Sequence, residues 1–288
     1  MKQILPASSF SPRYKNHAAG FTLVELLIVI VLTSIMGLAI LLNYQSQSRS
    51  YNVQRELAHM QQNIRAAMFL LQQDIRNSGR DPERSGQFGI QSIADDANNN
   101  ASLTMTRLLD TDNDGMADVG AVETIVYQLA DPDGDGRQEL QRCLNGVCQR
   151  IVDGVASMGF AYAYDDGSED LARFNGNPAN TEIWAYDGNG TNTLNTSADS
   201  DGDGDIDIDD APSGLGENIA LNRIRVVRIW LLARSRQAYP NFSDTNTYIL
   251  GDRMLNLAAP LNAPWRNFRH FLLSGAVSLQ NYQLSTNL

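Results

Sequence analysis

Lysine is almost absent from this sequence: its 288 residues include only Lys2 and Lys15, and both precede Gly20. The rest of the chain therefore lacks the lysine of a phosphate-binding loop and the lysine of a Schiff-base enzyme. The three histidines show no ligand-like spacing, and neither a Gly-x-Ser-x-Gly nor a His-Glu-x-x-His motif occurs. We therefore do not expect an enzyme.

Basic residues as a class are scarce as well. The chain contains 22 lysines and arginines against 33 acids, for a net charge of −11. The first 20 residues hold three of the basic residues and no acid, so the remainder carries 19 arginines (22 − 3) and a net charge of −14 (19 − 33). Nucleic acid is not an expected partner of so acidic a product. A DNA-uptake alternative rests on five arginines that alternate with apolar residues: Arg223, Arg225, Arg228, Arg234 and Arg236.

Residues 21–42 form an apolar run that contains a single charged residue, Glu25. At a rise of about 1.5 Å per residue, this run is long enough to cross the hydrocarbon core of a membrane. A secretory signal peptide does not fit, because the run is too long and no Ala-x-Ala cut site follows it. A plain signal anchor fits the length but leaves Glu25 unexplained. An ionised carboxylate in lipid costs about 2.5 kcal/mol or more, so Glu25 is expected to have a partner.

The segment GFTLVELLIV, residues 20–29, resembles the class III signal of type IV prepilins and type II secretion pseudopilins. The resemblance implies that a prepilin peptidase removes a leader, residues 1–20, by cutting between Gly20 and Phe21. It also implies N-methylation of Phe21. The cut creates an α-amino group one helical turn from Glu25, which can pair with that amine or with the amine of a neighbouring subunit. Glu25 is thus the expected assembly residue.

One long helix is predicted from residue 21 to residue 78, since no proline or glycine lies between Gly37 and Gly79. Residues 21–42 are apolar all round and would serve as transmembrane anchor and filament core. Residues 43–79 are amphipathic, with a stripe at spacings of three and four that consists of Val53, Leu57, Met60, Ile64, Ala67, Leu71 and Ile75. A free coiled coil is the alternative explanation of this stripe.

Residues 80–288 are predicted to form a β-rich periplasmic or extracellular domain. Strand-like segments occur at residues 122–129, 138–144, 147–152, 158–164, 224–234 and 268–279. The predicted fold class is α+β and pilin-like, with one long N-terminal helix packed against an antiparallel sheet with long Asp/Gly-rich loops. Residues 165–222, rich in Asp, Asn, Gly and Thr, are interpreted as a long loop or insertion.

The two cysteines flank a predicted hairpin in the segment CLNGVC, residues 143–148. Asn145-Gly146 favours a type I′ turn, because both central residues of that turn need positive φ. Such a turn places Cys143 opposite Cys148 at a closely spaced pair, so a disulfide across the hairpin is expected in an export compartment. Two free thiols are the main alternative; a metal site lacks further His or Cys ligands nearby.

Three aspartate-rich segments follow the pattern of calcium-binding loops, with oxygen ligands at alternate positions and glycine at the sixth. The most complete, residues 199–210, offers Asp199, Asp201, Asp203, Asp205, Asp207 and Asp210. The second, residues 110–121, offers Asp110, Asp112, Asp114 and Asp118. The third, residues 131–142, offers Asp131, Asp133, Asp135 and Glu139. Calcium is therefore the expected cofactor, and solvated turns are the alternative, since the same residues favour Asx turns.

Within the pilin class, three later segments resemble PilW-type minor pilins. They are SRSYNVQRELAHMQQNIRAAMFLLQQDIRNSGRDP at residues 48–82, VASMGFAYAYDDG at 155–167 and FRHFLLSGAVSLQN at 268–281. The resemblance implies a minor pilin that primes or tips a type IV pilus together with other minor pilins and the major pilin. Such a protein starts as a single-pass inner-membrane protein with a periplasmic domain and then reaches the cell surface. A J-type pseudopilin of type II secretion and a calcium-dependent tip adhesin are the alternatives.

Overall fold

The computed structural model of the chain describes residues 21–78, 89–95, 101–109, 121–165, 184–186, 195–197, 219, 221–251, 253–259 and 264–279. The chain forms two compact units, residues 1–54 and residues 55–288. Helix α1 (Leu23–Asn77) begins in the first unit and ends in the second. The long helix predicted at residues 21–78 is thereby confirmed, whereas Gly20 and Gly79 lie outside the described residues.

Local hydrogen bonds explain both ends of α1. At its start the Thr22 hydroxyl accepts the backbone N–H of Glu25 at 3.2 Å, and the Thr22 carbonyl accepts that of Leu26 at 3.2 Å. Thr22 is therefore the N-cap of the helix. At its end the Ser78 N–H donates to the Asp74 carbonyl at 2.8 Å, and the Ser78 hydroxyl donates to the Ile75 carbonyl at 2.7 Å. Ser78 thus pairs two carbonyls that the last turn leaves open.

The predicted apolar stripe of the second half of α1 faces a core, which favours the domain-covered interpretation over a free coiled coil. Ile64, Ala67, Leu71 and Ile75 are completely buried. Val53, Leu57 and Met60 are half-buried. The stripe is therefore most deeply buried toward the C-terminal end of the helix.

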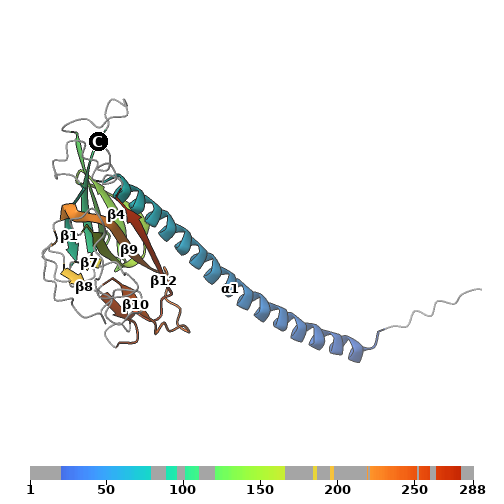
Figure 1. Cartoon of the computed structure of the whole chain (residues 1–288). Coiled ribbons are helices and arrows are strands. Elements are labelled where there is room, and N and C mark those ends of the chain that lie inside the picture. The colour runs from blue at the N-terminus through green and yellow to red at the C-terminus, as the bar shows by residue number, and fades with distance from the viewer. Residues whose placement is uncertain are drawn as a thin grey trace, which may run out of the picture. The chain divides into compact units, whose positions relative to one another are not determined.

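Within the described residues, the β-structure consists of two five-stranded antiparallel sheets and a separate hairpin (Figure 1). The predicted α+β class, a long helix packed on antiparallel strands, is confirmed, and the strands form two sheets where one was predicted. Sheet one has the order β1 (Gly89–Asp95), β2 (Ala101–Leu108), β3 (Val122–Ala130), β4 (Glu139–Leu144), β5 (Val147–Asp153). Sheet two has the order β12 (His270–Ser278), β9 (Ile224–Arg234), β6 (Val155–Tyr164), β7 (Trp184–Tyr186), β8 (Asn195–Ser197). The hairpin pairs β10 (Thr247–Leu250) with β11 (Arg253–Asn256), and a 3₁₀ turn, η1 (Leu221–Arg223), precedes β9.

Gly154 lies at the point where the chain leaves sheet one and enters sheet two. It is the single residue between β5 and β6, and its φ is +78°. A Cβ at this position would lie 2.9 Å from the Arg234 carbonyl oxygen and 3.1 Å from a guanidinium nitrogen of Arg137. Only glycine accommodates both the left-handed backbone and this close approach. The chain thus turns sharply here and passes from sheet one into sheet two.

Two hydrophobic cores lie on opposite faces of sheet two. Along β9, Val227, Ile229 and Leu231 belong to the main core, which also takes in the α1 stripe and residues of sheet one. Trp230 and Leu232, which point to the other face, belong to a smaller core with Leu250 of the β10–β11 hairpin. All ten residues of β6 are buried because both of its faces are covered.

Close approaches hold the hairpin and α1 against sheet two. A Cβ on Gly159 of β6 would lie 2.5 Å from the Leu250 carbonyl oxygen, so the hairpin rests directly on this strand. A Cβ on Gly275 of β12 would lie 2.6 Å from the side-chain Nε2 of Gln72, so here a side chain of α1, and not its backbone, approaches the strand. Strand β12 accordingly lies alongside the second half of α1 (Figure 1). Glycine at these positions permits the close approach.

Sheet one is joined to α1 by a buried carboxylate. Asp74 is 4% exposed, and its Oδ2 accepts the Tyr127 hydroxyl at 2.7 Å and the Arg142 Nε at 2.6 Å. A guanidinium nitrogen of Arg107 lies 3.6 Å from its Oδ1. Burial and the Asp74 carboxylate together raise the pKa of Tyr127. Side chains from β2, β3 and β4 thus converge on one charge of the helix.

We expect Asp74→Ala to lower the free energy of unfolding by about 3 kcal/mol, because it leaves the Arg142 guanidinium and the buried Tyr127 hydroxyl without their acceptor. Chemical denaturation of the full chain in detergent micelles measures this loss. Gln73→Ala is the matched control, since Gln73 is the exposed neighbour on the same helix. It is expected to change stability by no more than about 0.5 kcal/mol. Equal effects of the two substitutions would contradict the role assigned to Asp74.

Candidate functional site

The described residues of the first unit form a helix that is exposed over most of its length. Every residue from 21 to 50 is exposed. Its hydroxyl groups are paired within the helix: Thr33 donates to the Val29 carbonyl at 2.5 Å, and Ser34 donates to the Ile30 carbonyl at 2.7 Å. Thr22 serves as the N-cap. Internal pairing of this kind is what a helix needs in lipid or in an apolar filament core.

Glu25 differs from these residues. Within the described part of the first unit, its carboxylate has no hydrogen-bond or ion-pair partner. It lies in the first turn of α1, where the helix dipole favours negative charge. Thr22 and Glu25 have the three-residue spacing of a capping box, and the first of its two bonds, from the Glu25 N–H to the Thr22 hydroxyl, is formed. The arrangement leaves the carboxylate available to a cationic group near the helix start.

The same helix has the length and composition of a membrane span. An 18-residue window near the N-terminus is apolar enough to cross a membrane, and none of it is buried within the protein. Signal sequences share these properties. The apolar run and its one carboxylate therefore identify the N-terminal segment as the first candidate site.

The CLNGVC hairpin has the predicted geometry. Asn145 and Gly146 have φ values of 48° and 85°, as a type I′ turn requires. Leu144 pairs with Val147, and Cys143 pairs with Cys148 across β4 and β5. The two cysteines form a disulfide with a Cα–Cα distance of 3.8 Å, which confirms the predicted bridge. No free cysteine is left in the chain.

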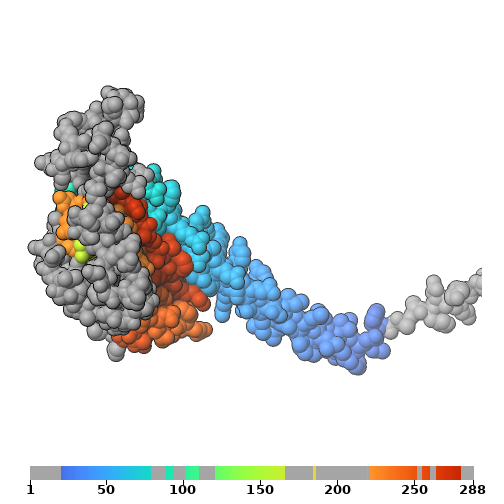
Figure 2. Space-filling model, viewed as in Figure 1, coloured from blue at the N-terminus to red at the C-terminus, as the bar shows by residue number. Residues whose placement is uncertain are grey.

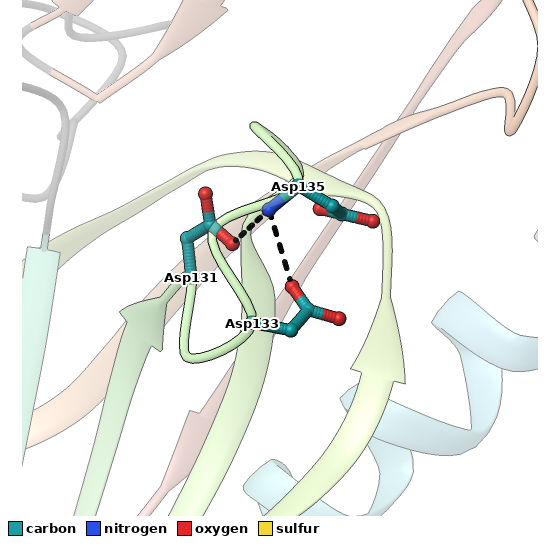
Figure 3. Close-up of side chains that lie close together, drawn as sticks. All are labelled: Asp131, Asp133 and Asp135. Carbon is teal, nitrogen blue, oxygen red and sulfur yellow. Dashed lines mark hydrogen bonds between the residues drawn. The ribbon is translucent and has the colours of Figure 1, made fainter.

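The loop between β3 and β4 gathers three of the predicted calcium ligands. One carboxylate oxygen from each of Asp131, Asp133 and Asp135 lies within 4.8 Å of the other two (Figure 3). The Asp135 N–H donates to the Asp131 carboxylate at 3.1 Å, and the Gly136 N–H donates to its other oxygen at 2.9 Å. Gly136, the sixth residue of the loop, has a φ of +77°. Desolvation and the neighbouring Asp135 charge raise the pKa of Asp133.

The ninth and twelfth residues of this loop do not face the three aspartates but form ion pairs elsewhere. Glu139, the predicted ninth-position ligand, is buried and accepts the Arg150 guanidinium at 2.6 Å. Arg142, at position twelve, pairs with Asp74 instead. The structure therefore brings together the three aspartates but not Glu139. Residues 110–120 and 199–210, which hold the other two predicted loops, lie outside the described residues.

Comparison with known proteins places the N-terminal segment in a described class. Residues 15–41 match the family model of the prokaryotic N-terminal methylation motif. The chain carries this motif. No curated protein matches the chain. Among solved structures, a type IV-like pilin from Thermus thermophilus is similar over 77% of this chain and 95% of that chain, with 13% sequence identity and a TM-score of 0.39.

The methylation motif covers the predicted cut site between Gly20 and Phe21, Glu25 and nearly all of the apolar run. Phe21 lies just before the N-cap and is 82% exposed. A new amine on Phe21 would stand four residues before Glu25, about one helical turn away. The methylation motif thus covers the residues that form the start of α1, including Phe21 and Glu25.

Three of the arginines on which the DNA-uptake alternative rests have partners within the domain. Arg225 pairs with Asp165 at 2.6 Å. Arg228 lies over the Trp230 ring at 5.1 Å, and Arg234 lies over the Phe268 ring at 4.6 Å. Their charges are used within the domain.

Sequence reasoning missed a carboxylate that joins α1 to the segment after β9. The Glu56 Oε1 accepts the backbone N–H groups of Arg236 at 2.5 Å and Gln237 at 3.2 Å, and its Oε2 accepts the Tyr239 hydroxyl. Burial and this carboxylate raise the pKa of Tyr239 to about 12. The Arg269 guanidinium stacks over the Tyr239 ring at 5.5 Å. This contact lies at the start of the second unit.

A second missed group is a buried acid–base pair. The His270 Nδ1 lies 2.9 Å from the Asp244 Oδ2, and the two side chains are 0% and 2% exposed. The Tyr248 hydroxyl donates to the same carboxylate oxygen at 2.8 Å. The buried Nε2 of His270 has no hydrogen-bond partner among the described residues. Burial lowers the pKa of His270, while Asp244 opposes that shift and the Arg234 charge adds to it.

We expect acid to weaken the fold through His270. The unfolded chain binds this proton near pH 6.5, whereas the folded chain binds it only at lower pH. The free energy of unfolding therefore falls as pH drops below about 6.5, and the loss is complete below the folded-state pKa. Denaturation curves at pH 7 and pH 5 measure it. His270→Gln is expected to reduce the difference, and His59→Gln, at an exposed histidine, to preserve it. The same pH difference in both variants would refute the assignment.

Proposed function

We propose that the chain is a type IV pilin-like subunit, of the PilW-type minor pilin class, that is processed by a prepilin peptidase and assembled with other pilins. The observation that carries this proposal is the coincidence of the methylation motif with the start of α1. There Phe21 and the Thr22 cap precede an exposed apolar helix, and Glu25 in its first turn is unpaired among the described residues. A cut after Gly20 supplies the cation that Glu25 lacks.

The arrangement favours a structural role over catalysis. An exposed apolar helix of this length needs either lipid or the apolar helices of neighbouring subunits around it. Before assembly the inner membrane supplies that environment, and after assembly the filament core does. The carboxylate then fixes the axial position of each subunit by pairing with a neighbour's α-amino group. The β-rich domain, with its export-type disulfide, faces away from the cytoplasm.

We expect the mature protein in its host to begin at Phe21 and to carry one added methyl group there. Intact-mass spectrometry measures both changes. Deletion of the gene is expected to remove most surface pili; the wild-type gene should restore them and Glu25→Ala should not, because the subunit then lacks its pairing charge. Gly20→Val is the processing control, since it should leave the leader attached. Undiminished piliation in the deletion strain would contradict the proposed role.

The J-type pseudopilin of type II secretion is the closest rival, because the N-terminal motif serves both machines equally well. The same deletion strain separates the two functions. Loss of surface pili with normal protein secretion favours the pilin, and normal pili with a secretion defect favours the pseudopilin. Cleavage before Phe21 and its methylation are expected for both a pilin and a pseudopilin. These two changes therefore test the motif but do not distinguish the pilus from the secretion system.

We further propose that the loop containing Asp131, Asp133 and Asp135 binds calcium. Three carboxylates this close repel one another, and a divalent cation relieves that repulsion. The loops at residues 110–121 and 199–210 are proposed sites of the same kind. Extracellular calcium near the millimolar range suffices for weak loops. A tip adhesin that depends on calcium is the functional extension, and surface binding lost on chelation while pili persist would favour it.

Calcium is expected to raise the melting temperature of the full chain relative to chelator. Asp131→Asn/Asp133→Asn should reduce this rise and remove one site from a calorimetric calcium titration, because two of its carboxylates are neutralised. Asp153→Asn is the matched control: Asp153 pairs with Arg137 at 3.0 Å outside the cluster, so its loss should leave the calcium response intact. Identical melting temperatures with calcium and with chelator would refute calcium binding.

A further inference from the structure

The outer face of α1 in the second unit carries a second regular stripe, opposite the buried one. Its residues are spaced alternately by four and three positions, and every one is exposed. They are Arg55, His59, Gln62, Ala66, Phe69, Gln73 and Arg76. Figure 2 shows this part of α1, coloured blue to cyan, at the surface of the molecule. A strict repeat of 3.5 residues is the spacing by which one helix packs along another in a left-handed pair.

The middle of this outer stripe is apolar. Phe69 is 69% exposed although it lies in the most deeply packed half of the helix. Ala66, one turn before it, is exposed as well and offers little bulk. A phenylalanine beside a small residue gives a partner helix both a knob and a hole. Aromatic anchors at the centre of a contact are also the residues that contribute most to binding.

The charge of the outer stripe is positive on an otherwise acidic protein. Arg55 and Arg76 stand at its two ends, and Arg65 flanks its centre. In the described part of the chain, none of these three arginines makes a hydrogen bond or an ion pair. The two acids on this part of the helix are turned away, since Asp74 is buried and Glu56 binds the segment after β9. Among the described residues, the face is therefore cationic and its arginines are unpaired.

We propose that the outer stripe binds an amphipathic helix of a different, acidic protein. Charge repulsion disfavours a second copy of the stripe as the partner. A parallel pair would place Arg55 beside Arg55 and Arg76 beside Arg76, and an antiparallel pair would place Arg55 beside Arg76. A partner helix with apolar residues along its seam and carboxylates beside them satisfies both the anchor and the arginines. The contact thus selects a heterologous neighbour over another copy.

This inference does not depend on the pilus assignment, because it concerns only the helix face within the second unit. The test uses the full chain in detergent micelles and fluorescent synthetic peptides, with anisotropy as the readout. One peptide carries leucine along a heptad seam and glutamate at the flanking positions. A second replaces every glutamate with lysine, and a third copies residues 52–78 of this chain. A DNA duplex is the fourth probe.

Only the glutamate peptide is expected to bind, and its affinity should fall as salt is raised. Arg65→Gln/Arg76→Gln should weaken it about fivefold, and Phe69→Ala about tenfold or more. The matched control is Val147→Glu/Gln149→Glu, which makes the same change in net charge at exposed positions of β5 and should leave the affinity unchanged.

Several outcomes would overturn the proposal. Equal binding of the glutamate and lysine peptides would show a merely apolar contact, and tight binding of the peptide from residues 52–78 would show that the stripe pairs with its own copy. DNA binding at least as strong as that of the glutamate peptide would make the face a nucleic-acid surface. Absence of binding to the glutamate peptide, or equal loss in the control variant, would refute the site.

Discussion

The packing of α1 on sheet one depends on a single buried charge. Apolar stripes alone allow a helix to slide along a sheet, because residues such as Leu71 and Ile75 recur at each turn and a shift of about 5.4 Å presents a similar surface. Asp74 does not recur. Its carboxylate meets Tyr127, Arg142 and Arg107 from three neighbouring strands in one position only, and any shift would leave a buried charge unpaired. The charge therefore fixes the register that the apolar residues leave open.

The elements that could be predicted from the sequence are those whose conformation is determined by residues close together in the chain. The bounds of α1 follow from the absence of proline and from Thr22 at its cap, and the CLNGVC hairpin follows from Asn145-Gly146. Strand β2 was not predicted, although buried Leu103 and Met105 alternate with polar neighbours as in a strand. Strands β7 and β8, at three residues each, are too short for any periodicity to reveal them.

The parts that were missed depend on partners far away in sequence. Asp74 and Tyr127 are 53 residues apart, and Asp244 and His270 are 26 apart, so no local spacing announces either pair. The same holds for Glu139. Its spacing from Asp131 in the sequence suits a calcium ligand. The pairing of β4 with β5, however, places it beside Arg150, and its carboxylate pairs with that guanidinium. The division into two sheets was missed for a related reason. The need for glycine at residue 154 depends on the Arg234 carbonyl, which is far away in the sequence.

The contacts of the cationic side chains in the folded domain suit arginine better than lysine. Arg234 is partly buried and its guanidinium lies over the rings of Trp265 and Phe268. Arg269 stacks on Phe242 at 4.3 Å, and Arg142 contacts both oxygens of Asp74. Planar guanidinium groups can stack and bind two oxygens at once, whereas an ammonium group is more strongly hydrated and loses more when buried. Cations used inside the domain are thus arginines held by rings and carboxylates. Arg55 and Arg76 on the outer stripe of α1 differ from these arginines, because neither contacts a ring or a carboxylate among the described residues. Their partner is therefore to be sought on another molecule.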